Sequence, residues 1–289
     1  MGPAVQAITG RPLDLSKWAV LPALIGTTIF FVVPLGVMLL WSFWQRIGGK
    51  LDQTLTLANY EKFFGRDYMV EGLTNSIEVA LITTVVSIVL AYPLAYIIAY
   101  RVPEQWQRFA LILAVLPFWT SYVIRSYSWL LILSEQGVIN SVLVGLGFID
   151  EPLAMGYNRG ATILGFVHFF TMLLTLTIYA NLVQIKKSYR LAAADLGASP
   201  VQVFLRVTLP LSLPGVAVGA FLTFVIAIGD YITPQILGGG RELLLPQAIM
   251  LQVTRAADFP MASAMSMTLM VVVTVTYLVF ARYLKMERV

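Results

Sequence analysis

The stretch YRLAAADLGASPVQVFLRVTLPLSLPG (residues 189–215) separates two apolar runs, and its residues are regularly spaced. One helix face is formed, at i, i+3, i+4 and i+7, by Tyr189, Ala192, Ala193 and Leu196. Gly197 then ends this helix, because glycine adopts the left-handed conformation without a side-chain clash. The pattern predicts a short amphipathic helix followed by a tight turn.

A second short helix is predicted directly after the turn. Ser199 can cap its N-terminus, and Pro200 suits its first turn, where no backbone N–H is needed. Its apolar stripe consists of Val201, Phe204, Leu205 and Thr208. Pro210 and Pro214 close the segment and begin the next apolar run. Two such helices on a membrane surface form a module that another protein can bind.

The composition indicates an integral membrane protein. Of the 289 residues, 58% are hydrophobic and 12% are charged, with a mean hydropathy of +0.81. A soluble protein carries about 25% charged residues. The absence of cysteine excludes disulfides and thiolate metal sites. Because the basic residues flank apolar runs rather than alternate with aromatic residues, the net charge of +4 does not indicate a nucleic-acid partner.

Six apolar runs are long enough to cross a bilayer core, which takes about 20 residues. They cover residues 18–44, 73–100, 108–133, 160–185, 211–237 and 262–284. We therefore expect an all-α membrane protein with a polar N-terminal segment (1–17) and one transmembrane domain (18–289). The stretch LANYEKFF (57–64) should fold back on the surface. Residues 137–148 are too short to span and should form an interfacial helix on the outer side.

The lysines and arginines near the ends of these runs predict the orientation. They are more frequent on the side that holds Arg101, Lys186, Lys187 and Arg282, whereas acidic residues are more frequent on the other side. Because cytoplasmic loops carry an excess of basic residues, both termini and the loop 186–210 are predicted to be cytoplasmic.

No group of residues has the pattern of an active site or a metal site. The single histidine, His168, lies in the fourth apolar run without a second ligand nearby, so we expect it to be packed or to face a pore. A glycine-rich phosphate loop that ends in Gly-Lys-Ser/Thr is also missing, so the chain is not itself an ATPase. We expect no catalytic residue, and we expect GGG (238–240) to form a turn.

Two charged residues at membrane depth carry a functional hypothesis, because such residues are costly and usually face a pathway or a partner. Arg125 lies among four aromatic residues, Trp119, Tyr122, Tyr127 and Trp129, and Asp230 precedes Tyr231. Pro234 can open the helix near Asp230. Either these residues line a translocation path, or Arg125 and Asp230 pair with each other or reach the outer interface. An aspartate in a cage of Trp and Tyr rings would suit an ammonium ligand.

The loop resembles a known motif. Ala192-Ala193, Gly197 and Val207-Thr208-Leu209-Pro210 match the spacing of the "EAA" loop in permease subunits of binding-protein-dependent ABC importers, which docks into a cytoplasmic ATPase. The resemblance implies that the ATPase contacts Tyr189, Arg190, Ala192, Ala193, Asp195, Gly197, Phe204 and Pro210. The position of the motif's glutamate is Leu191 here, so Arg190 or Asp195 must hold the loop instead.

Three further stretches extend the resemblance from about Asn59 to the C-terminus. They are LPFWTSYVIRSYSWLLIL, GVINSVLVGLGFIDEPL and AIGDYITPQILGG, and they resemble spermidine/putrescine-type permeases. The resemblance implies a six-span type I importer fold in the bacterial inner membrane that imports a polyamine. It also implies a second related permease, two ATPase copies that bind ATP and Mg, and a periplasmic binding protein. This chain then binds no cofactor itself.

Other classes of function remain open from the residues. Relatives of the same subfamily carry opines, phosphonates or iron complexes, so the resemblance leaves the substrate unresolved. An ion-coupled secondary transporter would need its own coupling-ion site, for which Asp230 is the candidate. A membrane enzyme would need a cluster of catalytic groups near one face, and the sequence contains none.

Overall fold

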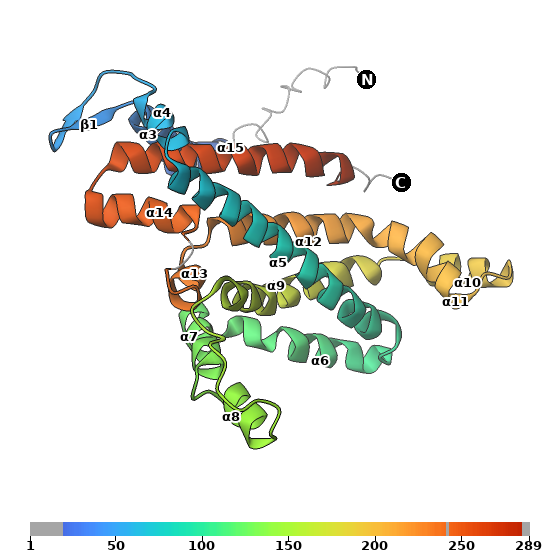
Figure 1. Ribbon diagram of the computed structural model, residues 1–289. Coiled ribbons are helices and arrows are strands. Elements are labelled where there is room, and N and C mark those ends of the chain that lie inside the picture. Colours follow the sequence, from blue (N-terminus) through green and yellow to red (C-terminus); the bar gives the residue numbers. More distant parts are fainter. Residues whose placement is uncertain (1–19, 241–242, 285–289) are drawn as a thin grey trace, which may run out of the picture.

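Helix α5 (Asp67–Tyr100) is the longest element, and other long helices pack along it (Figure 1). The computed structural model describes residues 20–240 and 243–284, so the expected segment 1–17 and the start of the first span lie outside the described residues. The 34 residues of α5 extend about 50 Å. This exceeds the roughly 30 Å of a bilayer core. The helix begins before the predicted span because Asp67 lies in its first turn, where a negative charge is favourable.

The core lies between α5, α9 (Arg159–Leu182) and α12 (Leu209–Gly229). Its buried apolar side chains include Val79, Phe166, Phe170, Leu174, Ile178 and Phe224. Gly219 of α12 faces α9 so closely that an added Cβ would clash with Thr177. Small residues at such a contact let two helix backbones approach, which is how membrane helices pack.

The first span consists of α2 (Leu21–Thr27), a π-helical turn η1 (Thr28–Val32) and α3 (Val33–Ser42). It packs on α15 (Phe259–Leu284), which also contacts α12. After a hairpin of β1 (Gln45–Ile47) and β2 (Lys50–Asp52), helix α4 (Ala58–Phe64) folds back as predicted. Asn59 fixes it by donating to the carbonyls of Ser42 (3.1 Å) and Trp44 (2.6 Å).

The predicted continuous helix over 108–133 is wrong. The chain forms α6 (Glu104–Val115), a 3₁₀ turn η2 (Leu116–Trp119) and α7 (Tyr122–Leu133), and Figure 1 draws α7 across the direction of α6. The bend follows Pro117, whose carbonyl accepts a bond from the Thr120 hydroxyl (2.7 Å). Thr120 is extended there. Because α6 and η2 rise about 26 Å, they nearly cross a bilayer core by themselves.

Six helical stretches of the described residues are long and apolar enough to cross a membrane, which confirms the predicted all-α membrane fold. One of them, Tyr122–Gly145, is divided into α7 and α8 (Val138–Gly145). Helix α8 confirms the short helix predicted over 137–148.

The predicted span 211–237 is also divided. Helix α12 ends at Gly229, and α13 (Ile232–Leu237), α14 (Leu245–Leu251) and a π-helical turn η4 (Gln252–Ala256) follow. Pro234 lies in the first turn of α13, where its missing N–H costs nothing, and the helix is interrupted at Asp230, four residues before it, as the expected opening near Pro234 requires. Residues 238–240 form the expected turn, since Gly239 and Gly240 have positive φ.

Candidate functional site

Helices α10 (Lys187–Asp195) and α11 (Pro200–Val203) form the two-helix module that the sequence predicts. Gly197 has φ +85°, and the N–H groups of Gly197 and Ala198 donate to the carbonyls of Ala194 (2.9 Å) and Ala193 (3.0 Å). This is a Schellman turn. Ser199 and Gln202 then form a reciprocal capping box at the start of α11. The turn therefore fixes the angle between the two helices through local bonds.

The α10–α11 module, defined as residues 187–203, is joined to the membrane core through α5. The guanidinium of Arg190 lies 3.8 Å from the centroid of the Tyr100 ring, and the Tyr100 hydroxyl donates to the Leu182 carbonyl at 2.9 Å. Beyond the module, Phe204 packs edge-on against Tyr92 and Tyr96, with ring centroids 5.8 and 5.6 Å away. A π-helical turn η3 (Phe204–Thr208) then continues into α12, where Pro210 lacks a donor. Movement of the module is thus linked to two core helices.

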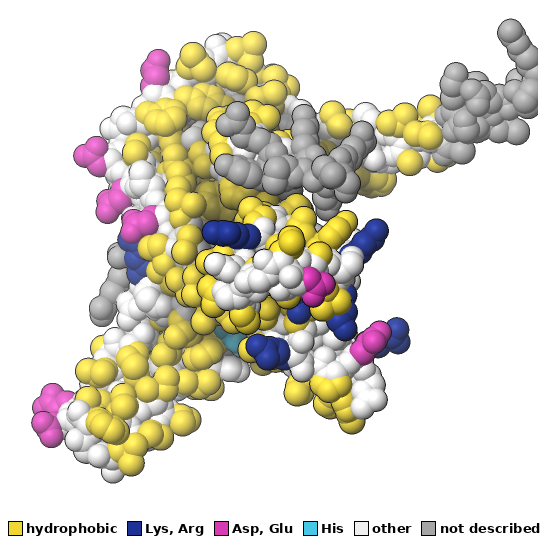
Figure 2. Space-filling view, turned by 90° about the vertical axis from the view of Figure 1, so that its right-hand side faces the viewer, with side chains coloured by type: hydrophobic (Ala, Val, Ile, Leu, Met, Phe, Trp, Pro, Cys, Tyr) yellow, Lys and Arg dark blue, Asp and Glu magenta, His cyan; other side chains and the backbone are white. Residues whose placement is uncertain are grey.

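Several apolar side chains of the module remain exposed. Leu196, at 89%, is the most exposed of them, and the others are Tyr189, Leu191 and Val201, followed by Leu205 of η3. Figure 2 views the molecule from this side and shows basic side chains near the centre, whereas most acidic side chains in view lie at the left margin. An exposed apolar surface beside cations is suited to binding another protein.

The residues that the sequence assigned to this surface differ in their exposure. Tyr189, Ala192, Asp195, Gly197 and Pro210 are exposed, Arg190 and Ala193 are half-buried, and Phe204 points inward to Tyr92 and Tyr96. Of the two residues expected to hold the loop in place of the missing glutamate, Arg190 makes the contact. Leu196 and Leu205 belong to the predicted apolar stripes but were omitted from the expected contact set.

A second cluster lies where α12 ends. Asp230 is extended, and its carboxylate accepts bonds from the N–H groups of Ile232 (2.8 Å) and Thr233 (3.3 Å) and from the Tyr122 hydroxyl. The Thr233 hydroxyl donates to the Tyr122 oxygen at 2.6 Å. The carboxylate caps α13 and ties it to α7, which explains why the helix breaks at Asp230.

Arg125 does not pair with Asp230, which corrects one of the two sequence hypotheses. Its guanidinium, 6% exposed as a residue, lies over the rings of Phe169 (4.5 Å) and Tyr122 (5.1 Å) and donates to the Pro117 carbonyl at 3.4 Å. These contacts are cation–π interactions in a desolvated place. Arg125 therefore occupies the face of Tyr122, one of the rings that the sequence offered to an ammonium ligand.

A cavity of about 260 Å³ lies beside Arg125, and Trp129, Ser128 and His168 contribute to its wall. The Trp129 indole N–H donates to Nδ1 of His168 at 3.0 Å. His168 is thus held by α7 and contributes to the wall of this cavity. In the described part of the chain, no three His, Cys, Asp or Glu side chains could hold a metal ion.

The expected pathway residues do not all meet. Tyr122, Arg125, Trp129 and Asp230 lie along the inner side of α7, whereas Trp119 (79% exposed), Tyr127 and Tyr231 are exposed. Sequence reasoning missed Phe169 and Thr233. Thr233 lies three residues after Asp230, which is the spacing of a helix cap, and this signal could have identified it.

Comparison with curated proteins identifies relatives along most of the chain. The spermidine/putrescine transport system permease protein PotB of Salmonella typhimurium (strain SL1344) is 32% identical over 265 residues, which is 91% of this chain and 92% of the relative. The same-named protein of Haemophilus influenzae is 30% identical, covering 88% of this chain and 89% of the relative. The inner membrane ABC transporter permease protein YdcU of Escherichia coli (strain K12) is 31% identical, covering 80% of this chain and 76% of the relative.

Solved structures share the fold at low sequence identity. A chain of a bacterial ABC transporter that imports the acidic polysaccharide alginate superimposes with a TM-score of 0.75 at 18% identity, covering 95% of this chain and 96% of that one. A chain of the MetNI methionine ABC transporter gives a TM-score of 0.57 at 16% identity, covering 75% and 95%. The fold is that of type I ABC importer permeases.

The family model for the "binding-protein-dependent transport system inner membrane component" matches residues 80–285. This range contains the α10–α11 module, most of the core and the Asp230 joint, which is the set of bonds that joins Asp230 to Tyr122 of α7 and to Ile232 and Thr233 of α13. The chain is a multi-pass inner membrane protein, and it belongs to the family of inner membrane components of binding-protein-dependent transport systems.

Proposed function

We propose that this chain is the permease subunit of an ABC importer that moves a polyamine, spermidine or putrescine, into the cytoplasm. The curated relatives named for spermidine/putrescine transport support this substrate, since they align with about nine-tenths of the chain. Opine, phosphonate and iron-complex substrates are the alternatives for the same architecture.

The energy comes from a separate subunit. Two copies of a cytoplasmic ATPase bind ATP and Mg, and this chain binds no cofactor itself. The α10–α11 module is the docking element for one ATPase copy, and a second, related permease supplies the other docking element. A periplasmic binding protein delivers the substrate.

The orientation follows from the module. The C-terminal ends of α5, α9 and α15 lie toward the same end of the bundle as α10 and α11 in Figure 1. If the module docks on the ATPase, this end faces the cytoplasm. The termini are then cytoplasmic as well. Residues 18–289 form one transmembrane domain, in which the loop 186–210 is the coupling segment.

The substrate passes along α7 and the Asp230 joint. Tyr122, Arg125, Trp129 and Asp230 line the inner part of this path, and the exposed rings of Trp119, Tyr127 and Tyr231 line its open side toward the second permease. Because the Asp230 carboxylate already accepts three hydrogen bonds, its main role is to hold α13 on α7 beside this path.

The observation that carries this proposal is the rigid module with its exposed leucine, fixed by Arg190 and Tyr100 to a core helix. The test is uptake of labelled spermidine and putrescine into proteoliposomes that contain both permeases, the ATPase and the binding protein. Uptake should require ATP and every subunit. Uptake driven by an ion gradient without the ATPase would instead identify a secondary transporter.

The substrate class needs its own test. A thermal-shift screen of the cognate binding protein should give its largest shift with polyamines. A larger shift with opines, phosphonates or iron complexes would retain the importer but change the cargo.

A further inference from the structure

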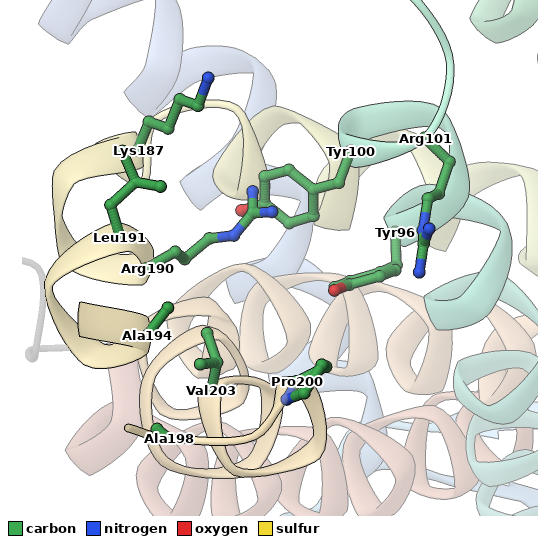
Figure 3. Close-up of a pocket in the computed structure, with 10 residues that line it drawn as sticks. All are labelled: Tyr96, Tyr100, Arg101, Lys187, Arg190, Leu191, Ala194, Ala198, Pro200 and Val203. Atoms are coloured by element: carbon green, nitrogen blue, oxygen red, sulfur yellow. The ribbon is translucent and has the colours of Figure 1, made fainter. Parts of the chain in front are cut away.

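A cavity of about 450 Å³ lies between the end of α5 and the α10–α11 module (Figure 3). Its ten described lining residues are Tyr96, Tyr100, Arg101, Lys187, Arg190, Leu191, Ala194, Ala198, Pro200 and Val203. Three of these are cations and none is a carboxylate. A space lined in this way attracts an anionic group.

Two of the three cations, Lys187 and Arg190, lie on α10, and the third, Arg101, directly follows α5. Arg190 reaches from α10 toward Tyr100, Arg101 follows the end of α5 near Tyr96, and Lys187 lies one turn before Leu191 at the rim (Figure 3). The Tyr100 ring holds the Arg190 guanidinium in place, so little side-chain freedom remains to be lost when an anion binds. The side chains Ala194 and Ala198 are small and leave room beside it.

The described part of the chain supplies no counter-charge for this cavity. None of the three cations lies within ion-pair distance of a described carboxylate, and Asp195 of α10 is not part of the lining. At the position where the loop motif has glutamate, the chain has Leu191. The module therefore presents cations without an acid of its own.

A protein that covers the module would remove water from these cations. The exposed side chains of Leu191, Leu196 and Val201 surround the same region and favour such a contact. Covering charges without a partner charge is strongly unfavourable, so a stable complex needs a carboxylate at this position. A carboxylate can also accept paired bonds from a guanidinium.

We propose that the cavity receives an aspartate or glutamate side chain of the docking ATPase. This inference rests on the proposed docking function of the module and adds the chemistry of its partner. The side chains of Arg101, Lys187 and Arg190 bind this carboxylate. Their contact with the ATPase takes the place of the contact that a glutamate on the loop would make.

The test measures ATPase affinity for the importer complex in nanodiscs, with the double variant Arg101→Gln/Lys187→Gln. The matched control is Lys186→Gln, because Lys186 is an exposed neighbouring cation outside the cavity. The double variant should weaken binding about tenfold, which corresponds to about 1.4 kcal/mol, and should reduce the salt dependence. The control should bind like the natural chain. Equal affinity of the double variant and the control would overturn the proposal.

Two further arms identify the anion. Lys187→Glu should abolish binding, and Asp/Glu→Lys at one position in the ATPase docking cleft should restore it; failure of every such ATPase variant to restore binding would overturn the proposal. Leu191→Glu should weaken binding, because the new carboxylate at i+4 would pair with Lys187. Stronger binding of this variant would contradict the proposal.

The lipid composition of the nanodiscs tests whether the anion in the cavity comes from the ATPase or from a lipid headgroup. The affinity loss should be the same in phosphatidylcholine nanodiscs with and without phosphatidylglycerol. A loss seen only with phosphatidylglycerol would assign the cavity to a lipid phosphate and overturn the proposal. If the natural chain binds no ATPase at all, the docking function fails as well. If Gly197→Val abolishes binding while the cavity variants do not, only the cavity proposal fails.

Discussion

Gly197 and Asp230 each end a helix, but different kinds of contact stabilise the two ends. At Gly197 every bond that shapes the turn joins residues at most five positions apart. At Asp230 two bonds are local, whereas the third comes from Tyr122, which is 108 positions away. The first end is a local turn, and the second is a tertiary joint.

The difference indicates two roles. A locally specified turn holds α10 and α11 at a fixed angle even before a partner binds, which suits a docking element. A tertiary joint links α7, α12 and α13, so a displacement of any one of these helices strains its contacts with the other two. The joint therefore suits a part of the path that opens and closes.

The largest effect is expected for Gly197→Val. The φ of +85° costs an L-residue about 1–2 kcal/mol, and a β-branched side chain increases the strain. No atom lies within 4 Å of an added Cβ, so the effect comes from the backbone alone. ATPase co-purification should be lost while membrane insertion is retained.

The control for this position is Gly197→Asn, because asparagine tolerates the left-handed conformation. It should retain most of the ATPase. Equal loss with Asn and Val, or normal co-purification with Val, would show that the turn does not orient the module.

A smaller effect is expected for Asp230→Asn. The amide can accept only part of the bonds that the carboxylate accepts, and a hydrogen bond to a charged group contributes about 1.5–3 kcal/mol. Uptake should slow severalfold, with basal ATP hydrolysis and subunit assembly largely unchanged. Tyr122→Phe should have a similar effect, and the double variant should be little worse than either single one. Additive effects would mean that the two residues act separately.

A substitution of Arg125 serves as a control for the bonds of Asp230. Because Arg125 contacts Phe169 and Pro117 rather than Asp230, Arg125→Gln should not rescue Asp230→Asn. Rescue would restore the hypothesis of a direct charge pair.

The smallest effect is expected for Ser199→Ala. Loss of this N-cap should destabilise the start of α11 by about 1 kcal/mol. Hydrogen exchange should increase over residues 199–203, and ATPase affinity should fall by less than for Gly197→Val. Asp230→Asn should leave this exchange unchanged, and a faster exchange there would mean that the two helix ends are not independent.

The sequence predicts these two regions unequally well, and the reason is physical. The α10–α11 module was predictable because Gly197, Ser199 and Pro200 act on their neighbours. The break at Asp230 was less predictable, since its bond from Tyr122 joins residues 108 positions apart. The bend after Pro117 rests on local bonds to the Pro117 carbonyl, but it lies inside an apolar run that favours one continuous helix. The sequence paired Arg125 with Asp230 by charge alone, whereas burial against Phe169 determines where Arg125 lies.

The most direct test of the docking role uses the absence of cysteine from the chain. Leu196→Cys places one thiol on the α10–α11 module, where the natural side chain is 89% exposed. Leu146→Cys is the control, because Leu146 follows α8 and is 67% exposed. After labelling with a thiol-reactive photo-crosslinker in the assembled importer, Leu196→Cys should crosslink to the ATPase and Leu146→Cys should not. Crosslinking from residue 146 but not from residue 196 would contradict the proposed docking surface.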